Sequence, residues 1–284
     1  YKIMLPTDER FRYSYTTGWR QETIITKITE KQTLEINDFI KNYWTNKLEI
    51  LFDNSVSSGL NQIDGNKIKF GLNSYLSPSN KDALIWSESD MRFYIPVWRS
   101  ITFAQRIAGA YNLGRHKNGF YLGSVENWIQ KNQLPDKPVF LNPDGILFQT
   151  WVCNLRGFYR GARMGHSYVV SNSELRLPVM KMLYKRPLAS EFLKHFTLTA
   201  FADAGCAFTG KSPADNENPY NTKYLSTPNY TMSITSRRNP WLLGVGYGAR
   251  SRILGYFVKY DRARGLQEGR WERSMHYLSM GLDF

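Results

Sequence analysis

The segment CNLRGFYRGARMG, residues 153–165, concentrates side chains that could do chemistry. It holds three arginines, two aromatic residues and three glycines, and its spacing fits neither a helix nor a strand. Such a stretch is compatible with an RNA-binding surface, a phosphate-binding loop, or a loop folded among carboxylates in a confined polar space. The strands and loops predicted around the segment distinguish between these three kinds of site.

Charge and hydropathy narrow the class of protein. The chain has 284 residues, a formal net charge of +13 and a mean hydropathy of −0.46. The charge is compatible with nucleic acid, with an anionic membrane surface, or with solubility alone. No run of 18 apolar residues occurs, which excludes a transmembrane helix. A membrane β-barrel is not excluded by this hydropathy, because only alternate residues of its strands need to be apolar.

Enzyme and metal signatures are missing from the sequence. There is no GxSxG nucleophile motif and no phosphate-binding loop, and the four histidines show no metal-ligand spacing. Cys153 and Cys206 form no CxxC pair. Glu88 and Asp90 share one strand face, where pairing with arginines is favoured over acid–base chemistry. We therefore expect no enzymatic activity, no metal and no cofactor.

The glycine run in GVGYGA, residues 244–249, is not a dinucleotide fingerprint. That fingerprint requires a strand, then the glycines, then a helix, whereas these glycines alternate within a strand and no helix follows. Glycines on one face of a strand instead indicate that another segment approaches closely. We expect a loop to pack against this face.

Period-two alternation dominates the chain. It is clear in KIKFGLN (67–73), FTLTAFADAG (196–205) and HYLSMGLDF (276–284). Several of the 11 to 13 candidate strands run for about ten residues, the length that a tilted strand needs to cross a bilayer. The polar faces carry charges deep within the strands, at Glu88, Asp90, Arg92, Arg106, Glu174, Arg176, Arg250, Arg252, Lys259 and Asp261. These features predict an all-β fold, a transmembrane antiparallel β-barrel.

The connections agree with a barrel that has long loops on one side and short turns on the other. Polar, turn-rich linkers are expected at 57–65, 77–82, 132–145 and 209–230, and a tight turn at 253–255. Residues 33–45 have mixed periodicity, which is compatible with a short helix or an irregular loop.

Asp203 offers a carboxylate with which an arginine of residues 153–165 could pair. Asp203 lies on the polar face of the second strand after them. An arginine in a confined, partly dehydrated interior requires such a partner. This favours the folded-in loop over the RNA-binding surface.

Five motifs in order resemble the C-terminal part of the Omp85 superfamily barrel, the outer-membrane proteins related to BamA, TamA and the two-partner secretion transporters. The resemblance covers residues 145–284, while the first half agrees in strand pattern only. Residues 147–155 are most similar to a branch in which a β-propeller precedes the barrel. The motifs are LRGF (155–158), NSELRLP (172–178), FADAG (201–205), GVGYGAR (244–250) and GYFVKYD (255–261), followed by the final Phe284.

The resemblance implies roles for particular residues. Arg156, Gly157 and Phe158 resemble the signature of the loop that folds into the barrel lumen. Arg156 would pair with Asp203, Gly157 would allow a tight turn, and Phe158 would pack against the wall. Asp203 and Gly205 belong to the inner-wall motif, and Glu174 would be a second partner.

The resemblance also implies an architecture. The family barrel has sixteen strands, and we expect residues 1–284 to form one such barrel or part of it, with the N-terminal periplasmic region absent from this sequence. Residues 274–284 would form the closing strand, which pairs weakly with the first. One face of this closing strand would carry Leu278, Met280, Leu282 and Phe284. Phe284 would belong to the signal by which the barrel itself is inserted.

The expected function follows from the same resemblance. The chain would lie in the Gram-negative outer membrane and take part in the insertion, assembly or translocation of other proteins. Its partners would be outer-membrane lipid or lipopolysaccharide and client or accessory outer-membrane proteins, without nucleic acid. The alternatives are a passive outer-membrane channel or scaffold subunit, and a soluble basic nucleic-acid binder.

Overall fold

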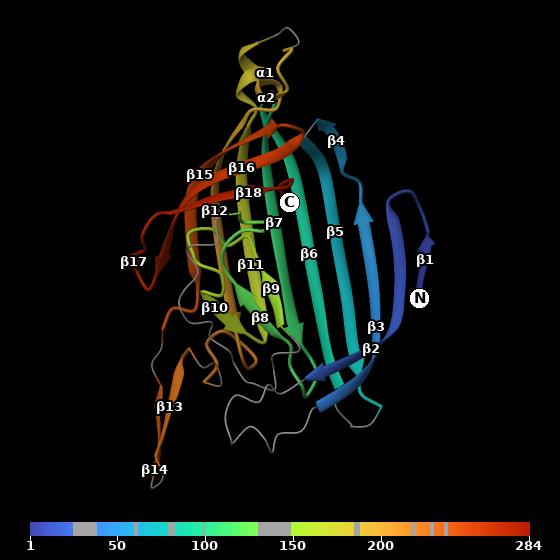
Figure 1. Ribbon diagram of the computed structural model, residues 1–284, viewed down its shortest axis with the longest axis vertical. Helices are drawn as coiled ribbons and strands as arrows, with labels where there is room; N and C mark the ends of the chain where they lie inside the picture. Colours follow the sequence, from blue (N-terminus) through green and yellow to red (C-terminus); the bar gives the residue numbers. More distant parts are fainter. Residues whose placement is uncertain are drawn as a thin grey trace.

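The computed structural model is dominated by one large antiparallel sheet of 13 strands (Figure 1). It describes residues 1–24, 39–59, 62–78, 83–98, 100–129, 149–184, 188–216, 218, 220–227, 230–235 and 238–284. The prediction of an all-β antiparallel fold is confirmed. Among the described residues, no helix is long and apolar enough to cross a membrane.

The elements follow the alternation of the sequence. The strands are β1 (Lys2–Pro6), β2 (Phe11–Ile24), β3 (Phe39–Asp53), β4 (Val56–Gly59), β5 (Gln62–Leu76), β6 (Ala83–Trp98), β7 (Ile101–Asn112), β8 (Gly119–Leu122), β9 (Gln149–Val152), β10 (Arg163–Gly165), β11 (Ser167–Leu177), β12 (Thr197–Phe208), β13 (Thr222–Thr227), β14 (Tyr230–Thr235), β15 (Leu242–Ile253), β16 (Tyr256–Gln267), β17 (Arg270–Trp271) and β18 (Met275–Met280). Two short helices, α1 (Val179–Leu183) and α2 (Glu191–Lys194), join β11 to β12.

The main sheet is ordered β1-β2-β3-β5-β6-β7-β11-β12-β15-β16, and β18 pairs with the far side of β16. All of these neighbours are antiparallel. Ten reversals of direction therefore separate β1 from β18, so the two edge strands run the same way. In the described chain β1 and β18 lie at opposite edges of the sheet without pairing, and the closing role of residues 274–284 stays a prediction. Their direct closure would require a parallel pair in an otherwise antiparallel sheet.

The two faces of the sheet differ in chemistry. In β15, Leu243, Val245 and Tyr247 are exposed on the outer face, whereas Gly244 and Arg250 are buried on the inner face. The same rule holds in β12, where exposed Leu198 and Ala200 alternate with buried threonine and aspartate. A sheet with an apolar outside and a charged inside is the pattern of a membrane barrel wall.

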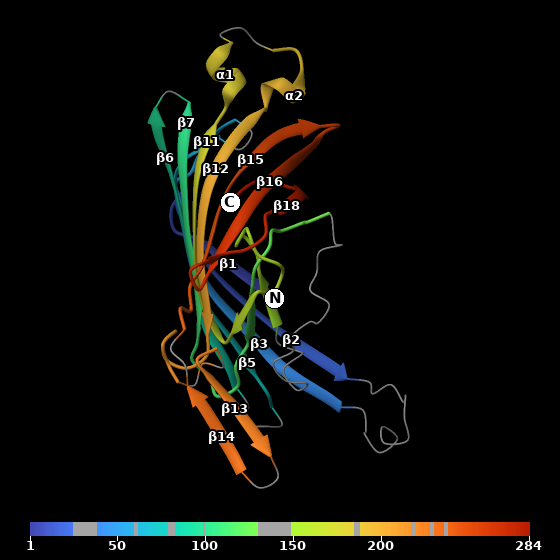
Figure 2. The ribbon, with the colours of Figure 1, turned by 90° about the vertical axis from the view of Figure 1, so that its left-hand side faces the viewer.

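The inner face is covered by the chain between β7 and β11. This segment forms a small three-stranded sheet of order β10-β8-β9. Figure 2 shows it, together with the C-terminus, on the side toward which the main sheet curves. A buried apolar cluster joins the two layers and includes Phe120, Leu122, Leu155, Phe158, Val170 and Leu242.

The connections between the strands test the turns and linkers that the sequence predicts. The tight turn predicted at residues 253–255 is confirmed, because Leu254 and Gly255 take φ angles of 50° and 87° between β15 and β16. Positive φ at both positions is the requirement of a two-residue hairpin turn of type I′. The β13–β14 hairpin projects from the opposite end, whereas the long β11–β12 connection with α1 and α2 lies at the same end as this turn (Figure 1). The expected linkers at 77–82 and 132–145 lie partly or wholly outside the described residues.

Two local predictions are wrong. Residues 39–45 were expected in a short helix or an irregular loop but belong to β3, and residues 33–38 lie outside the described part. Residues 57–65 were expected to be a linker, yet β4 and β5 form a hairpin there. At residues 39–45, pairing with β2 overrides a weak local pattern.

Candidate functional site

Arg156 lies at the centre of the candidate site, with its side chain almost fully buried against the inner wall. Its Nε and Nη2 atoms donate to Oδ2 and Oδ1 of Asp203 at 2.7 and 2.8 Å. Its Nη1 donates to Oε1 of Glu174 at 2.5 Å. The paired donation to one carboxylate is the fork geometry that arginine forms with aspartate. The structure therefore joins one loop arginine to two neighbouring strands, β11 and β12.

Further contacts complete the surroundings of the guanidinium. The ring of Phe201 lies under it, with 3.6 Å from Cζ to the ring centroid. Asn172 donates through Nδ2 to Asp203 at 2.9 Å and to the backbone oxygen of Asn154. Burial by itself lowers the pKa of Arg156, but the neighbouring carboxylates outweigh it and hold that pKa well above its ordinary value. The arginine is therefore permanently charged and ion-paired.

Gly157 and Phe158 turn the loop onto the wall. Gly157 has a φ of 92°, and a Cβ there would lie 2.6 Å from the backbone nitrogen of Gly265. Its N–H donates to the hydroxyl of Tyr277 at 3.0 Å, and that hydroxyl donates to the oxygen of Phe158 at 2.8 Å. Only glycine combines this backbone conformation with so close an approach. Tyr277 thus attaches the loop to β18.

The glycines on the inner face of β15 and β16 leave room for the loop. A Cβ on Gly244 would fall directly on the carbonyl oxygen of Arg156, and one on Gly265 would lie 2.6 Å from the ring of Phe158. On β12, a Cβ on Gly205 would lie 3.0 Å from the side chain of Leu122. The prediction that a loop packs against the glycines of residues 244–249 is confirmed at Gly244, whereas Cβ atoms on Gly246 and Gly248 would meet residues of the sheet itself.

A second layer of charge lies beside the first. Arg176 donates to Oε2 of Glu174 from Nη2 at 2.9 Å. Asp283 pairs with Arg250 at 3.0 Å and with Lys259 at 3.4 Å. Glu174 therefore connects the arginine of the loop with an arginine of the wall.

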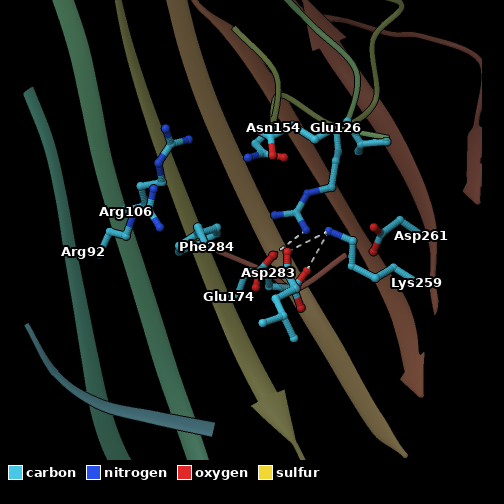
Figure 3. Close-up of a pocket in the computed structure, with 12 residues that line it drawn as sticks. Arg92, Arg106, Glu126, Asn154, Glu174, Lys259, Asp261, Asp283 and Phe284 are labelled. Atoms are coloured by element: carbon cyan, nitrogen blue, oxygen red, sulfur yellow. Dashed lines mark hydrogen bonds and ion pairs between the residues drawn. The ribbon is translucent and has the colours of Figure 1, made fainter. Parts of the chain in front are cut away.

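A polar cavity of about 250 Å³ lies among these groups. Its lining brings together charges of both signs from β6, β7, β11 and β16, and Figure 3 shows Lys259 linked to Asp283 at its edge. The lining residues are Arg92, Arg106, Val125, Glu126, Asn154, Arg156, Glu174, Lys259, Asp261, Leu282, Asp283 and Phe284. The described residues contain no cluster of histidine, cysteine, aspartate or glutamate that could hold a metal ion.

The end of the chain differs from the expectation. Leu278 and Met280 are exposed on the outer face, but β18 ends at Met280 and Gly281 turns the chain with a φ of 119°. Leu282 is exposed, whereas Phe284 turns inward, where its oxygen accepts from Nη2 of Arg176 at 3.1 Å. The expectation that Phe284 continues the outer face is wrong, because a left-handed glycine breaks the alternation.

Tyr277, Asn172 and Phe201 were missed as site residues by sequence reasoning. Tyr277 lies on the polar side of an alternating strand, where a large aromatic residue among Ser279, Gly281 and Asp283 was the available signal. Asn172 and Phe201 each begin one of the five motifs that carry the resemblance. Their contacts depend on strand register, which the sequence does not reveal.

Comparison with known proteins rests on structure. No protein-family model matches the chain, and no curated protein is significantly similar in sequence. The crystal structure of BamA from Haemophilus ducreyi lacking POTRA domains 1–3 superposes with a TM-score of 0.60 at 13% identity. The chain has a BamA-like β-barrel fold. The match covers 99% of this chain and 53% of the BamA chain, so this chain spans about half of that structure's length.

Proposed function

We propose that this chain is an outer-membrane β-barrel protein of the Omp85 type that takes part in the insertion, assembly or translocation of other proteins in a Gram-negative cell. One observation carries the proposal: the loop of residues 153–162 docks on the inner wall through Arg156, Asp203 and Glu174. These residues belong to the motifs by which the sequence resembles that family. The BamA-like fold also supports the proposal.

The apolar outer face supports the proposed location. Leu243, Val245, Tyr247, Phe70 and Leu72 are all exposed on that face. In water they would form an unusually large apolar surface, whereas lipid would bury it. Outer-membrane lipid or lipopolysaccharide is therefore the proposed surrounding medium, with client or accessory outer-membrane proteins as partners.

The proposed mechanism is physical and includes no covalent step. The docked loop lies on the inner side of the sheet, and its ion pairs join it to the neighbouring wall strands β11 and β12. A protein with this role would act on its clients by offering backbone hydrogen bonds and a shaped membrane environment. Nucleic acid has no place in this mechanism, because the loop arginine Arg156 is already paired and buried.

The test is reconstitution of the protein in phospholipid vesicles. An unfolded outer-membrane protein is added, and its insertion is followed by heat-modifiable migration on gels. The proposal predicts faster insertion with the protein than with empty vesicles or with vesicles that hold an unrelated barrel. Equal rates in all three would contradict it.

A passive channel is the second candidate, favoured by the polar cavity of about 250 Å³ beside the loop. It predicts steady conductance in planar bilayers and no effect on client insertion. The docked loop argues against it, because Phe158 and the small β8–β10 sheet occupy the inner side. A conductance that rises only when the loop is loosened would favour the assembly role.

A further inference from the structure

Two arginines lie on the outer face of the main sheet, beside strands that carry apolar side chains there. Arg262 and Arg264 are exposed and occupy outward positions in the alternating pattern of β16. Across the ladder, Arg264 faces Val245 of β15 and Arg262 faces Tyr247. β16 is an interior strand, with β15 on one side and β18 on the other (Figure 1). The two charges therefore belong to the broad face of the sheet and not to one of its edges.

These outer arginines differ from the arginines of the inner face in their partners. Arg156, Arg176 and Arg250 on the inner face each pair with a carboxylate. Among the described residues, neither Arg262 nor Arg264 forms an ion pair. Inside the sheet the protein neutralises its own positive charge, whereas on the outer face the counter-charge has to come from the surroundings.

The β16–β17 hairpin as a whole carries a surplus of positive charge. Residues 262–273 contain four arginines and two glutamates. Glu268 already accepts a hydrogen bond from Tyr220 and pairs with Arg238 at 4.0 Å, while Glu272 is exposed. The hairpin therefore presents a net positive surface.

Uncharged groups hold the two guanidinium groups in place. Nε of Arg262 donates to Oγ of Ser274 at 3.1 Å, and its Nη1 donates to the hydroxyl of Tyr247 at 3.2 Å. Nε of Arg264 donates to the backbone oxygen of Glu272 at 3.3 Å. Within the described chain, these contacts leave Nη2 of Arg262 and both Nη atoms of Arg264 without an acceptor. The arginines are thus oriented by the protein while their terminal donors stay free.

Aromatic side chains border the same place. Trp271 is exposed on β17, and Cζ of Arg264 lies 5.6 Å from the centroid of its ring. Tyr260 is the preceding outward residue on β16, and its hydroxyl lies 2.6 Å from Nδ1 of His276. Tryptophan and tyrosine beside arginine are typical of the level at which a membrane protein meets lipid headgroups. We call Arg262, Arg264 and Trp271 the outer arginine patch.

The chemistry of the outer arginine patch favours a phosphate group. A charged side chain on a lipid-facing wall is unfavourable unless an opposite charge or water meets it. A guanidinium group donates to phosphate oxygens two at a time, and the free Nη atoms of Arg264 form one such pair of donors. The apolar outer face of β15 continues beside the patch at Leu243 and Val245, where acyl chains can lie. Donors and apolar wall together match a lipid with a negatively charged phosphate.

We propose that the outer arginine patch binds the phosphate group of an anionic membrane lipid through Arg262 and Arg264. This inference deepens the proposed function, since it requires the outer face to stand in lipid. The phosphate supplies the counter-charge that the described chain does not provide on this face. The bound lipid then fixes the headgroup level at the β16–β17 hairpin.

The test measures which lipid lies beside the patch in vesicles. The full chain, with Cys153 and Cys206 replaced by serine, carries one fluorophore on Leu243→Cys, two residues from Val245 on the outer face. A second protein carries the fluorophore on Phe70→Cys of β5, which five strands separate from β16 in the sheet. Phosphatidylcholine vesicles contain a fixed fraction of brominated phosphatidylglycerol or of brominated phosphatidylcholine. The ratio of quenching by these two lipids reports the local enrichment of the anionic lipid.

Two double variants and one control identify the groups responsible. Arg262→Gln with Arg264→Gln removes both charges but keeps hydrogen-bonding side chains, and the corresponding lysine pair keeps charge without the fork. The control is Arg252→Gln, which removes an exposed arginine that already pairs with Glu191 at 3.3 Å. Heat-modifiable migration on gels shows that each variant is folded.

We expect the parent to enrich phosphatidylglycerol at residue 243 by at least about five-fold over residue 70, the effect of roughly one arginine near an anionic headgroup. The glutamine pair should abolish the difference and the lysine pair should reduce it, whereas Arg252→Gln should leave it unchanged. Inorganic phosphate should compete no better than chloride at the same ionic strength, because the acyl chains contribute to binding.

Separate outcomes would overturn the inference and the proposed function. Equal enrichment at residues 243 and 70, or enrichment that survives the glutamine pair, would overturn the inference, because overall charge would then explain it. Specific loss of enrichment with inorganic phosphate would make a free ion the occupant and overturn the lipid. Quenching by neither lipid at either residue would contradict both the patch and the proposed location. Enrichment at residue 243 without client insertion would confirm the patch and contradict the assembly role.

Discussion

Replacing Arg156 by alanine should be among the most damaging single changes to this protein that leave its strands intact. The Arg156 side chain donates two hydrogen bonds to the Asp203 carboxylate and one, from Nη1, to Glu174. After the change, Asp203 keeps only Asn172 and the backbone N–H of residue 156, whereas Glu174 keeps Arg176. A buried carboxylate thus loses its counter-charge.

The expected loss follows from that burial. Asp203 and Glu174 are 2% and 1% exposed, so little water can replace the guanidinium. Removing one partner of such a pair lowers the free energy of unfolding by about 3–5 kcal/mol. The protein should still fold, because the strand ladders do not pass through residue 156. Denaturant unfolding in detergent micelles, followed by tryptophan fluorescence, measures the change.

The matched control is Lys194→Ala. Lys194 pairs with Glu191 at 3.4 Å on the exposed α2 helix, and its loss should leave the unfolding midpoint unchanged. A cycle of Arg156→Ala, Asp203→Ala and the double variant isolates the coupling between the two side chains. If each single variant unfolds at the parent midpoint, the loop is not held by this pair and the reasoning is refuted.

Three further changes test separate parts of the structure. Tyr277→Phe leaves the N–H of Gly157 and the oxygen of Phe158 without their partner, and should lower the free energy of unfolding by about 1–3 kcal/mol, measured by the same denaturant titration. Gly244→Ala would place a methyl group on the carbonyl oxygen of Arg156, so it should loosen the loop and speed its hydrogen exchange; unchanged exchange would contradict the close approach. Leu243→Arg on the outer face should cost about 2–4 kcal/mol if that position lies near the bilayer midplane, and a change within experimental error in vesicles would place it outside the lipid.

The main features of the fold could be read from the sequence because they depend on local alternation. The charged faces of β12 and β15, the tight turn at Gly255 and the inner glycines all follow from period two and from backbone conformation. The pairing of Arg156 with Asp203 followed from motif order and from the need of a buried arginine for a carboxylate.

The remaining features depend on register and direction, which have no local signal. β18 lies beyond β16 and runs in the same direction as β1. This arrangement follows only from the complete set of strand pairings. Phe284 turns inward because of the left-handed conformation of Gly281, and alternation alone placed it outside. The bridge of Trp128 to Ser279 joins segments about 150 residues apart, beyond the reach of any pattern in one sequence.

The proposed function requires the sheet to stand in a bilayer with its apolar face toward lipid. Phe70 and Lys69 are neighbours on β5, with Phe70 exposed on the outer face and Lys69 on the inner face near Glu88. Each is replaced by a single cysteine, labelled with a fluorophore and reconstituted in vesicles that contain brominated lipid. We predict strong quenching at residue 70 and little at residue 69. Equal, weak quenching at both positions would contradict a membrane-embedded barrel and, with it, the proposed role at the outer membrane.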